Sequence, residues 1–125
     1  MSLSTSYFID SNILMTMENL ILPPDIFPSV WEGMKDLHVQ GKWGLLDIVF
    51  KEITRGTGFA AEWIKDSSFV TIVARDEATI RAYTQIIQSV VDKPQYRAAA
   101  KEAFANSVDS WIIAFSRAYG KTIVS

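Results

Sequence analysis

The sequence contains no cysteine among its 125 residues, which excludes a disulfide framework, a thiolate zinc site and a cysteine nucleophile. It has only 6 glycines and 4 prolines, too few for a collagen-like or low-complexity chain. No apolar run approaches the ~20 residues of a transmembrane helix, and no basic stretch precedes a hydrophobic one at the N-terminus. We therefore expect a cytoplasmic protein that does not enter a membrane and in which oxygen ligands hold any metal ion.

An excess of positive charge is also missing. Twelve Lys and Arg stand against 14 Asp and Glu, which gives a formal net charge of -2. Without an overall basic field, a nucleic acid has to be bound at a local site. The chain is instead rich in hydrophobic residues, at 49%. This fraction predicts a single globular domain over residues 1–125 with one hydrophobic core.

Short apolar runs alternate with helical patterns along the chain. We expect strands where the runs are β-branched or apolar and end at polar residues, at 7–9, 45–49, 69–73 and 122–124. Apolar residues at helical spacing predict helices at 30–41, 50–55, 59–65, 80–91, 96–105 and 106–120. This alternation predicts an α/β fold of three layers, α/β/α, with a central parallel sheet of about four strands. Because the chain ends at Ser125 within the last predicted strand, we expect the domain to be incomplete at its C-terminus.

Three carboxylates are expected at one edge of this sheet. Asp10 follows the first strand, Glu52 lies in the first helical turn after the second, and Asp109 opens the helix that leads into the fourth. Ligands of parallel sheets bind at the carboxyl ends of the strands, where a returning helix also begins. Clustered carboxylates repel one another unless a divalent cation neutralises them, and all-oxygen coordination suits Mg²⁺ or Mn²⁺. These ions can activate water for attack on a phosphodiester.

Each of these residues also has a purely structural interpretation. Asp10 belongs to an Asp-Ser-Asn sequence that can form an Asx turn. Glu52 precedes Arg55 by three residues, the spacing of a helical ion pair, and Asp109 lies where a carboxylate caps a helix or favours its dipole. We interpret the single histidine, His38, as a half-buried or interface residue rather than a general base, and the four tryptophans as packing residues rather than base-stacking ones.

Three motifs resemble the acidic motifs of PIN-domain (VapC-like) nucleases. They are Tyr-Phe-Ile-Asp-Ser-Asn at 7–12, Lys-Glu-Ile at 51–53, and Ser-Val-Asp-Ser-Trp-Ile-Ile-Ala-Phe-Ser at 107–116. The similarity spans nearly the whole chain and is nearest to an uncharacterised bacterial PIN-like branch. It implies a PIN fold, Mg²⁺ or Mn²⁺ bound by the catalytic residues Asp10, Glu52 and Asp109, and Asn12 as a supporting residue for Asp10. The activity it implies is that of a metal-dependent endoribonuclease.

Many members of this family are toxins of toxin-antitoxin pairs. The resemblance therefore implies an RNA substrate and a small antitoxin protein that holds the enzyme inactive, and an exposed sheet edge predicts a homodimer or other oligomer. The family also has a further acidic residue after the last strand, a point this chain does not reach before Ser125. Two alternatives stay open. One is a catalytically weak PIN-like module that binds a partner protein or RNA, and the other is a flavodoxin- or receiver-shaped domain that binds Mg²⁺ for phosphoryl transfer.

Overall fold

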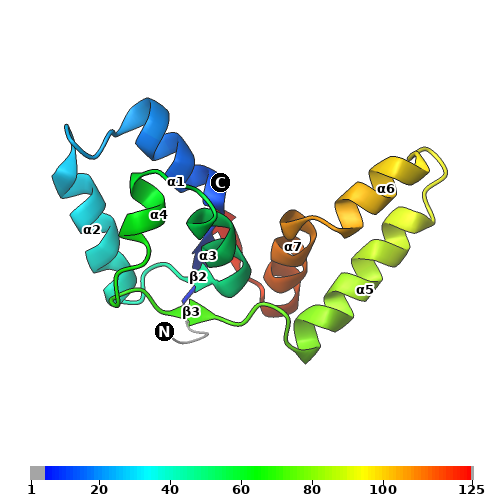
Figure 1. Ribbon diagram of the computed structural model, residues 1–125. Helices are drawn as coiled ribbons and strands as arrows, with labels where there is room; N and C mark the ends of the chain where they lie inside the picture. Colours follow the sequence, from blue (N-terminus) through cyan, green and yellow to red (C-terminus); the bar gives the residue numbers. More distant parts are fainter. Residues whose placement is uncertain (1–4, 125) are drawn as a thin grey trace. The chain divides into compact units, whose positions relative to one another are not determined.

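The computed structural model describes residues 5–124, and over these residues it is a mixed α/β protein, as predicted (Figure 1). The described elements are, in chain order, β1 (Tyr7–Ile9), α1 (Ser11–Thr16), the π-helical turn η1 (Met17–Ile21), α2 (Pro28–Val39), β2 (Leu45–Leu46), α3 (Asp47–Thr54), α4 (Phe59–Trp63), β3 (Thr71–Ile72), α5 (Glu77–Val91), α6 (Ala98–Ala105), α7 (Val108–Tyr119) and β4 (Thr122–Val124). They form two compact units. Unit 1 contains the chain up to Val73 together with β4, and unit 2 is Ala74–Lys121.

All the described strands belong to unit 1 and run parallel in two pairs. β1 pairs with β4, with Phe8 opposite Ile123, and β2 pairs with β3, with Leu45 opposite Thr71. One isolated parallel bridge, between Phe8 and Gly44, links the two pairs. The parallel direction agrees with the prediction, whereas a single central sheet of about four strands is not confirmed, because the described residues form two sheets of two strands.

The second strand is shorter than predicted. Residues 47–49 belong to α3, which begins at Asp47. The Asp47 carboxylate accepts a hydrogen bond of 2.9 Å from the Ile48 N–H. Ile48, Val49 and Ile53 are the buried residues of this helix, at the spacing of one helical face. A short apolar run does not distinguish a buried strand from a buried helix, which is why the prediction of a strand over 45–49 is wrong beyond Leu46.

Aromatic side chains form much of the core of unit 1. The rings of Trp31 and Trp63 meet edge to face with centroids 5.0 Å apart, and those of His38 and Trp43 lie 4.7 Å apart. His38 Nε2 accepts a hydrogen bond from the Val70 N–H, so Nδ1 carries the proton and donates to the Trp43 carbonyl, each at 3.0 Å. Burial lowers the pKa of His38. The histidine is therefore a packed, neutral residue. The sequence predicts a half-buried or interface position, whereas the side chain is only 1% exposed.

Gly44 allows a close approach between β1 and the start of β2. Its N–H donates to the Tyr7 carbonyl at 2.7 Å, and the ring of the fully buried Phe8 lies directly against it. A Cβ atom at position 44 would lie 2.8 Å from two ring carbons of Phe8, Cδ1 and Cζ. No residue with a side chain fits there without displacing the ring.

Unit 2 consists of α5, α6 and α7. The carboxylate of Asp76 caps α5 by accepting a hydrogen bond of 2.9 Å from the Thr79 N–H, so the helix begins earlier than the apolar stripe predicts. The hydroxyl of Tyr119, at the end of α7, also donates to Asp76. Burial acts to raise the pKa of Asp76, but the hydrogen bonds from Tyr119 and Thr79 outweigh it and lower the pKa. None of the described helices has both the length and the apolar character needed to cross a bilayer.

Candidate functional site

Asp10 lies at the carboxyl end of β1, where the strand passes into α1. Its N–H donates to the Val124 carbonyl at 2.9 Å, which continues the pairing of β1 with β4. Its side chain is 8% exposed and makes no capping hydrogen bond to α1. The interpretation of Asp10 as a capping residue is therefore not supported. A buried carboxylate that the backbone does not use needs another partner.

Ser11, the first residue of α1, is this partner. Its Oγ lies 3.4 Å from Asp10 Oδ1 and also makes a hydrogen bond to Glu52 Oε1. A hydroxyl group has a single proton to donate, so the two carboxylates share one donor. The structure thus brings two of the three predicted site residues, Asp10 and Glu52, to one buried serine hydroxyl.

Glu52 reaches Ser11 from α3. Because α3 begins at Asp47, Glu52 lies in the second turn of this helix and not in the first turn, as predicted. The side chain is half-buried, and its hydrogen bond goes to Ser11. No ion pair joins it to Arg55 among the residues that the structure describes. The contact across the sheet edge therefore replaces the local ion pair that the sequence spacing allows.

Asp109 belongs to unit 2, in the first turn of α7. The cap of α7 is Ser107, whose Oγ accepts a hydrogen bond of 3.2 Å from the Ser110 N–H, so Asp109 is not the capping residue. Its carboxylate is exposed, at a position where negative charge favours the helix dipole. Within residues 5–124, neither unit by itself has three His, Asp or Glu side chains grouped so that they could hold a metal ion. The site of three carboxylates stays a prediction.

Asn12, the predicted supporting residue, is exposed in the first turn of α1. The hydrogen-bonding partner of Asp10 is its direct neighbour Ser11, a residue that the sequence reasoning did not select. The only signal for Ser11 was its place in the Asp-Ser-Asn motif. That it also reaches Glu52 depends on how α1 and α3 are arranged.

Glu18, another carboxylate of unit 1, has a structural role. Its Oε1 accepts hydrogen bonds from the N–H groups of Phe59 and Ala60 and so caps the short helix α4. A Cβ atom at Gly58 would lie 2.5 Å from Glu18 Oε1, so a larger residue at that position would displace the capping carboxylate. Glu18 is therefore occupied by α4, and we do not include it in the site.

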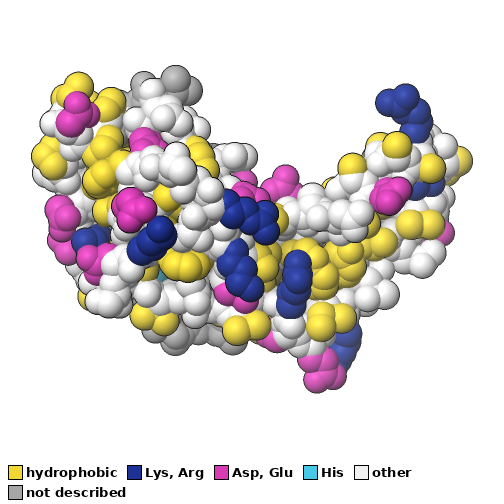
Figure 2. All heavy atoms as spheres, viewed as in Figure 1, with side chains coloured by type: hydrophobic (Ala, Val, Ile, Leu, Met, Phe, Trp, Pro, Cys, Tyr) yellow, Lys and Arg dark blue, Asp and Glu magenta, His cyan; other side chains and the backbone are white. Residues whose placement is uncertain are grey.

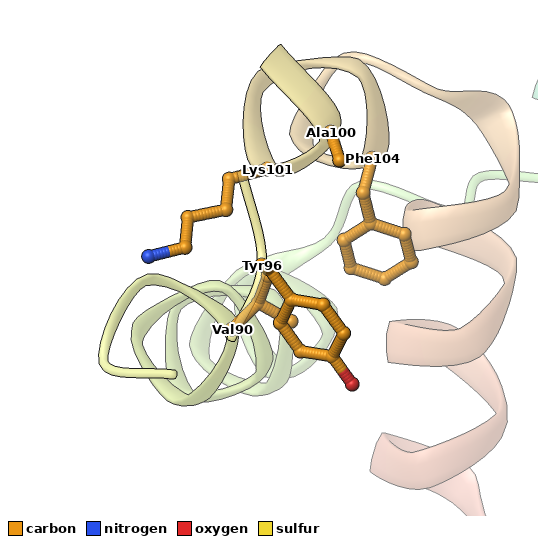
Figure 3. Close-up of a pocket in the computed structure, with 5 residues that line it drawn as sticks. All are labelled: Val90, Tyr96, Ala100, Lys101 and Phe104. Carbon is orange, nitrogen blue, oxygen red and sulfur yellow. The ribbon is translucent and has the colours of Figure 1, made fainter. Parts of the chain in front are cut away.

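A separate apolar pocket lies in unit 2 between the end of α5 and α6. It has a volume of about 300 Å³ and is lined by Val90, Tyr96, Ala100, Lys101 and Phe104. Figure 3 shows the rings of Tyr96 and Phe104 on the same side, whereas Lys101 extends in another direction, with its Nζ donating to the Val91 carbonyl at 2.8 Å. No residue of α6 is buried, and hydrophobic side chains are visible along α5 and α6 in Figure 2.

The pair formed by Asp10 and Glu52 has the chemistry of a cation site. Both are oxygen ligands, and a hard divalent ion such as Mg²⁺ is bound through one or two carboxylates and several waters. Two carboxylates close together are also a source of mutual repulsion that a cation removes. The residues present therefore fit Mg²⁺ or Mn²⁺.

Residues 7–125 match the protein family described as "Domain of unknown function (DUF4411)". Comparison with curated proteins and with solved structures finds no match.

Proposed function

The chain belongs to the DUF4411 family, and we propose that it is a metal-dependent endoribonuclease of PIN type. The observation that carries the proposal is the serine hydroxyl shared by Asp10 and Glu52. It supports the proposal because it brings together the first two acidic motifs of the PIN resemblance. Asp109, in the third motif, keeps an exposed carboxylate that does not cap its helix.

In this proposal Asp10, Glu52 and Asp109 hold Mg²⁺ or Mn²⁺. The bound metal supplies a neutralising charge for the phosphodiester and lowers the pKa of water. Ser11 orients the carboxylates of Asp10 and Glu52 through its single proton. Asn12, exposed beside them in the first turn of α1, is the supporting residue that would face the substrate or a water molecule.

The proposed fold is the PIN arrangement with one central parallel sheet. Two observations support it. The paired strands are all parallel, and the bridge from Phe8 to Gly44 gives the strand order β4, β1, β2, β3. In that order the carboxyl ends of β1 and β2 share an edge, which is where Asp10 and the start of α3 lie.

The partners that we propose come from the PIN resemblance. They are an RNA substrate in the cytoplasm, a small antitoxin protein that holds the enzyme inactive, and a second copy of the chain in a homodimer or other oligomer. An enzyme of this kind acts as the toxin of a toxin-antitoxin pair.

The test is cleavage of a single-stranded RNA with Mg²⁺, with Mn²⁺ and with EDTA. We expect cleavage only with metal, and a loss of about 100-fold or more in Asp10→Asn, Glu52→Gln and Asp109→Asn, because each removes a charged ligand. Asp36→Asn and Glu102→Gln are matched controls, since both carboxylates are exposed on helices outside the motifs. Equal activity in the control and motif variants would contradict the proposal.

A second readout does not depend on activity. A metal ion that binds the folded state raises its melting temperature, and Asp109→Asn should abolish the increase. If Asp109 is only structural, the melting temperature does not respond to metal. In that case losing a charge that favours the dipole of α7 costs about 0.3 to 1 kcal/mol.

The second candidate function is a catalytically weak PIN-like module that binds a partner protein or RNA. The observation that favours it is the apolar pocket of α5 and α6, with the exposed ring of Tyr96, which has no role in the proposed cleavage. Metal binding without cleavage in the experiments above is the outcome that favours this candidate.

A further inference from the structure

A stack of three side chains in unit 2 has no role in the proposed chemistry. The rings of Tyr83 in α5 and Trp111 in α7 lie parallel, with centroids 3.9 Å apart and an interplanar angle of 3°. The guanidinium carbon of Arg75 lies 4.8 Å from the centroid of the Trp111 ring. The Tyr83 hydroxyl donates to the Ala105 carbonyl at 2.7 Å, which fixes the tyrosine. Arg75 is thus held over an indole whose own position is fixed.

The backbone around Arg75 is also held. Ala74, just before it, is fully buried, and Asp76, just after it, is the N-cap of α5. A cation–π contact of this kind uses the flat face of a guanidinium, whereas its N–H donors lie in the plane and point outwards. Arg75 is exposed, and its guanidinium donates no hydrogen bond to a residue that the structure describes.

Arg75 differs from the paired cations of the protein. Arg81 makes an ion pair with Glu77, and Lys35 makes one with Asp66. Arg75 has no carboxylate partner among the residues that the structure describes. An arginine that is oriented by stacking and not neutralised is preorganised to bind an acceptor with two oxygens, such as a phosphate, in a bidentate manner.

The charge of unit 2 favours an anionic ligand. Residues 74–121 contain seven Lys and Arg and five Asp and Glu, a formal net charge of +2 within a chain whose total is -2. The helix that carries Trp111 also carries Asp109, two residues earlier. Trp111, the central residue of the stack, therefore lies on the same helix as the third acidic motif.

We propose that Arg75 is a phosphate-binding residue that holds the backbone of single-stranded RNA. Trp111 and Tyr83 are positioning residues, because the indole already has two stacking partners and serves to orient the guanidinium. The choice of RNA as the ligand rests on the proposed nuclease function. The phosphate chemistry of the contact rests on Arg75 itself.

The test is the affinity for a 5′-labelled single-stranded RNA of about 12 nucleotides, measured by fluorescence anisotropy in EDTA, where no metal-dependent cleavage occurs. We expect Arg75→Gln to weaken binding about tenfold, because a charge-assisted bidentate contact is lost. The slope of log affinity against log salt should fall by about 0.7, the contribution of one phosphate contact in a single strand. Arg97→Gln is the matched control, since Arg97 is exposed in the same unit and has no ring partner among the described residues.

Three more variants separate positioning from charge. Arg75→Lys keeps the charge, so the salt slope should stay near the wild-type value while the affinity falls through loss of the fork geometry. Trp111→Leu should weaken binding several-fold with an unchanged salt slope, and Trp111→Phe should restore part of the affinity, because a ring is again present. Circular dichroism shows whether the two Trp111 variants are folded, and the Arg75 variants test the proposal independently of them.

The outcomes distinguish this inference from the nuclease proposal. Equal affinities of Arg75→Gln and Arg97→Gln overturn the inference even if the wild-type protein cleaves RNA. So does a loss of affinity in Arg117→Gln alone, because Arg117 lines a separate cleft between α5 and α7. If Arg75→Gln loses binding while no metal supports cleavage by the wild-type protein, the inference holds and the nuclease proposal fails.

Discussion

Unit 1 and unit 2 are each stabilised by a different kind of interaction. Unit 1 has all the described strands and five fully or nearly fully buried aromatic rings, those of Phe8, Trp31, His38, Trp43 and Trp63. In unit 2 the one described aromatic ring with the same burial is Phe115, and the other buried residues there are mostly small, such as Ala74, Ala82, Ser110 and Ala114. Small buried side chains contribute little apolar area. Unit 2 therefore depends more on caps and side-chain hydrogen bonds.

The two units also differ in charge. Unit 2 has a formal net charge of +2, whereas the rest of the chain has five Lys and Arg against nine Asp and Glu, a net charge of -4. The carboxylate pair of Asp10 and Glu52 lies in the acidic unit and the stacked arginine in the basic one. A net charge of -2 for the whole chain conceals this division.

The largest effect should follow from a substitution in the packed core of unit 1. Gly44→Ala places a Cβ against the buried ring of Phe8, and overpacking of this kind costs about 3 kcal/mol of the free energy of unfolding. Gly33→Ala is the matched control, because Gly33 lies in α2 and a Cβ atom added there would meet nothing within 4 Å, so the change should stabilise the protein by up to about 1 kcal/mol. Urea unfolding measures both, and equal effects would contradict this account of the core.

Removing a side-chain hydrogen bond of unit 2 should have a smaller effect on the free energy of unfolding. Tyr119→Phe removes the hydrogen bond to Asp76 and should cost about 1 kcal/mol. Because the pKa of Asp76 is lowered in the folded state, its contribution is present above the ordinary pKa of 3.8 and is lost as the pH falls below it. The variant should therefore lose less stability on acidification than the wild type. Tyr7→Phe, at an exposed tyrosine, is the control and should change neither quantity.

The smallest effect is that of His38 on the pH dependence of the free energy of unfolding. Its pKa is lowered by burial, so the folded state binds fewer protons than the unfolded state just below pH 6.5. The free energy of unfolding should fall as the pH drops below 6.5. His38→Gln, which cannot titrate, should show a shallower fall in urea unfolding between about pH 7 and about pH 5. Identical slopes would show that His38 does not titrate differently on unfolding.

Several elements could be predicted from the sequence because their signals are local. The apolar stripe of 80–91 predicted most of α5, and Asn106-Ser107 and Gly120 marked the limits of α7, where Ser107 is the cap and Gly120 adopts φ 63°. The apolar run before Asp10 predicted β1 with its full bounds. In each case a few neighbouring residues decide the conformation.

Other features depend on contacts between distant segments. The short apolar run from Leu45 to Val49 is compatible with a strand and with a helix. The start of α3 at Asp47 was therefore not predictable from this run, because only packing decides between the two conformations. The same holds for Gly44, whose lack of a side chain matters because Phe8 lies against it.

By itself, the sequence determined the α/β class, the polar ends of the apolar runs and the order of the three acidic motifs, since all of these are patterns along the chain. Tertiary structure decided which carboxylates meet. Glu52 turns to the hydroxyl of Ser11 and not to Arg55, and Arg75 stacks on Trp111. These contacts join residues far apart in sequence, and their geometry depends on how the helices pack, which no local pattern contains.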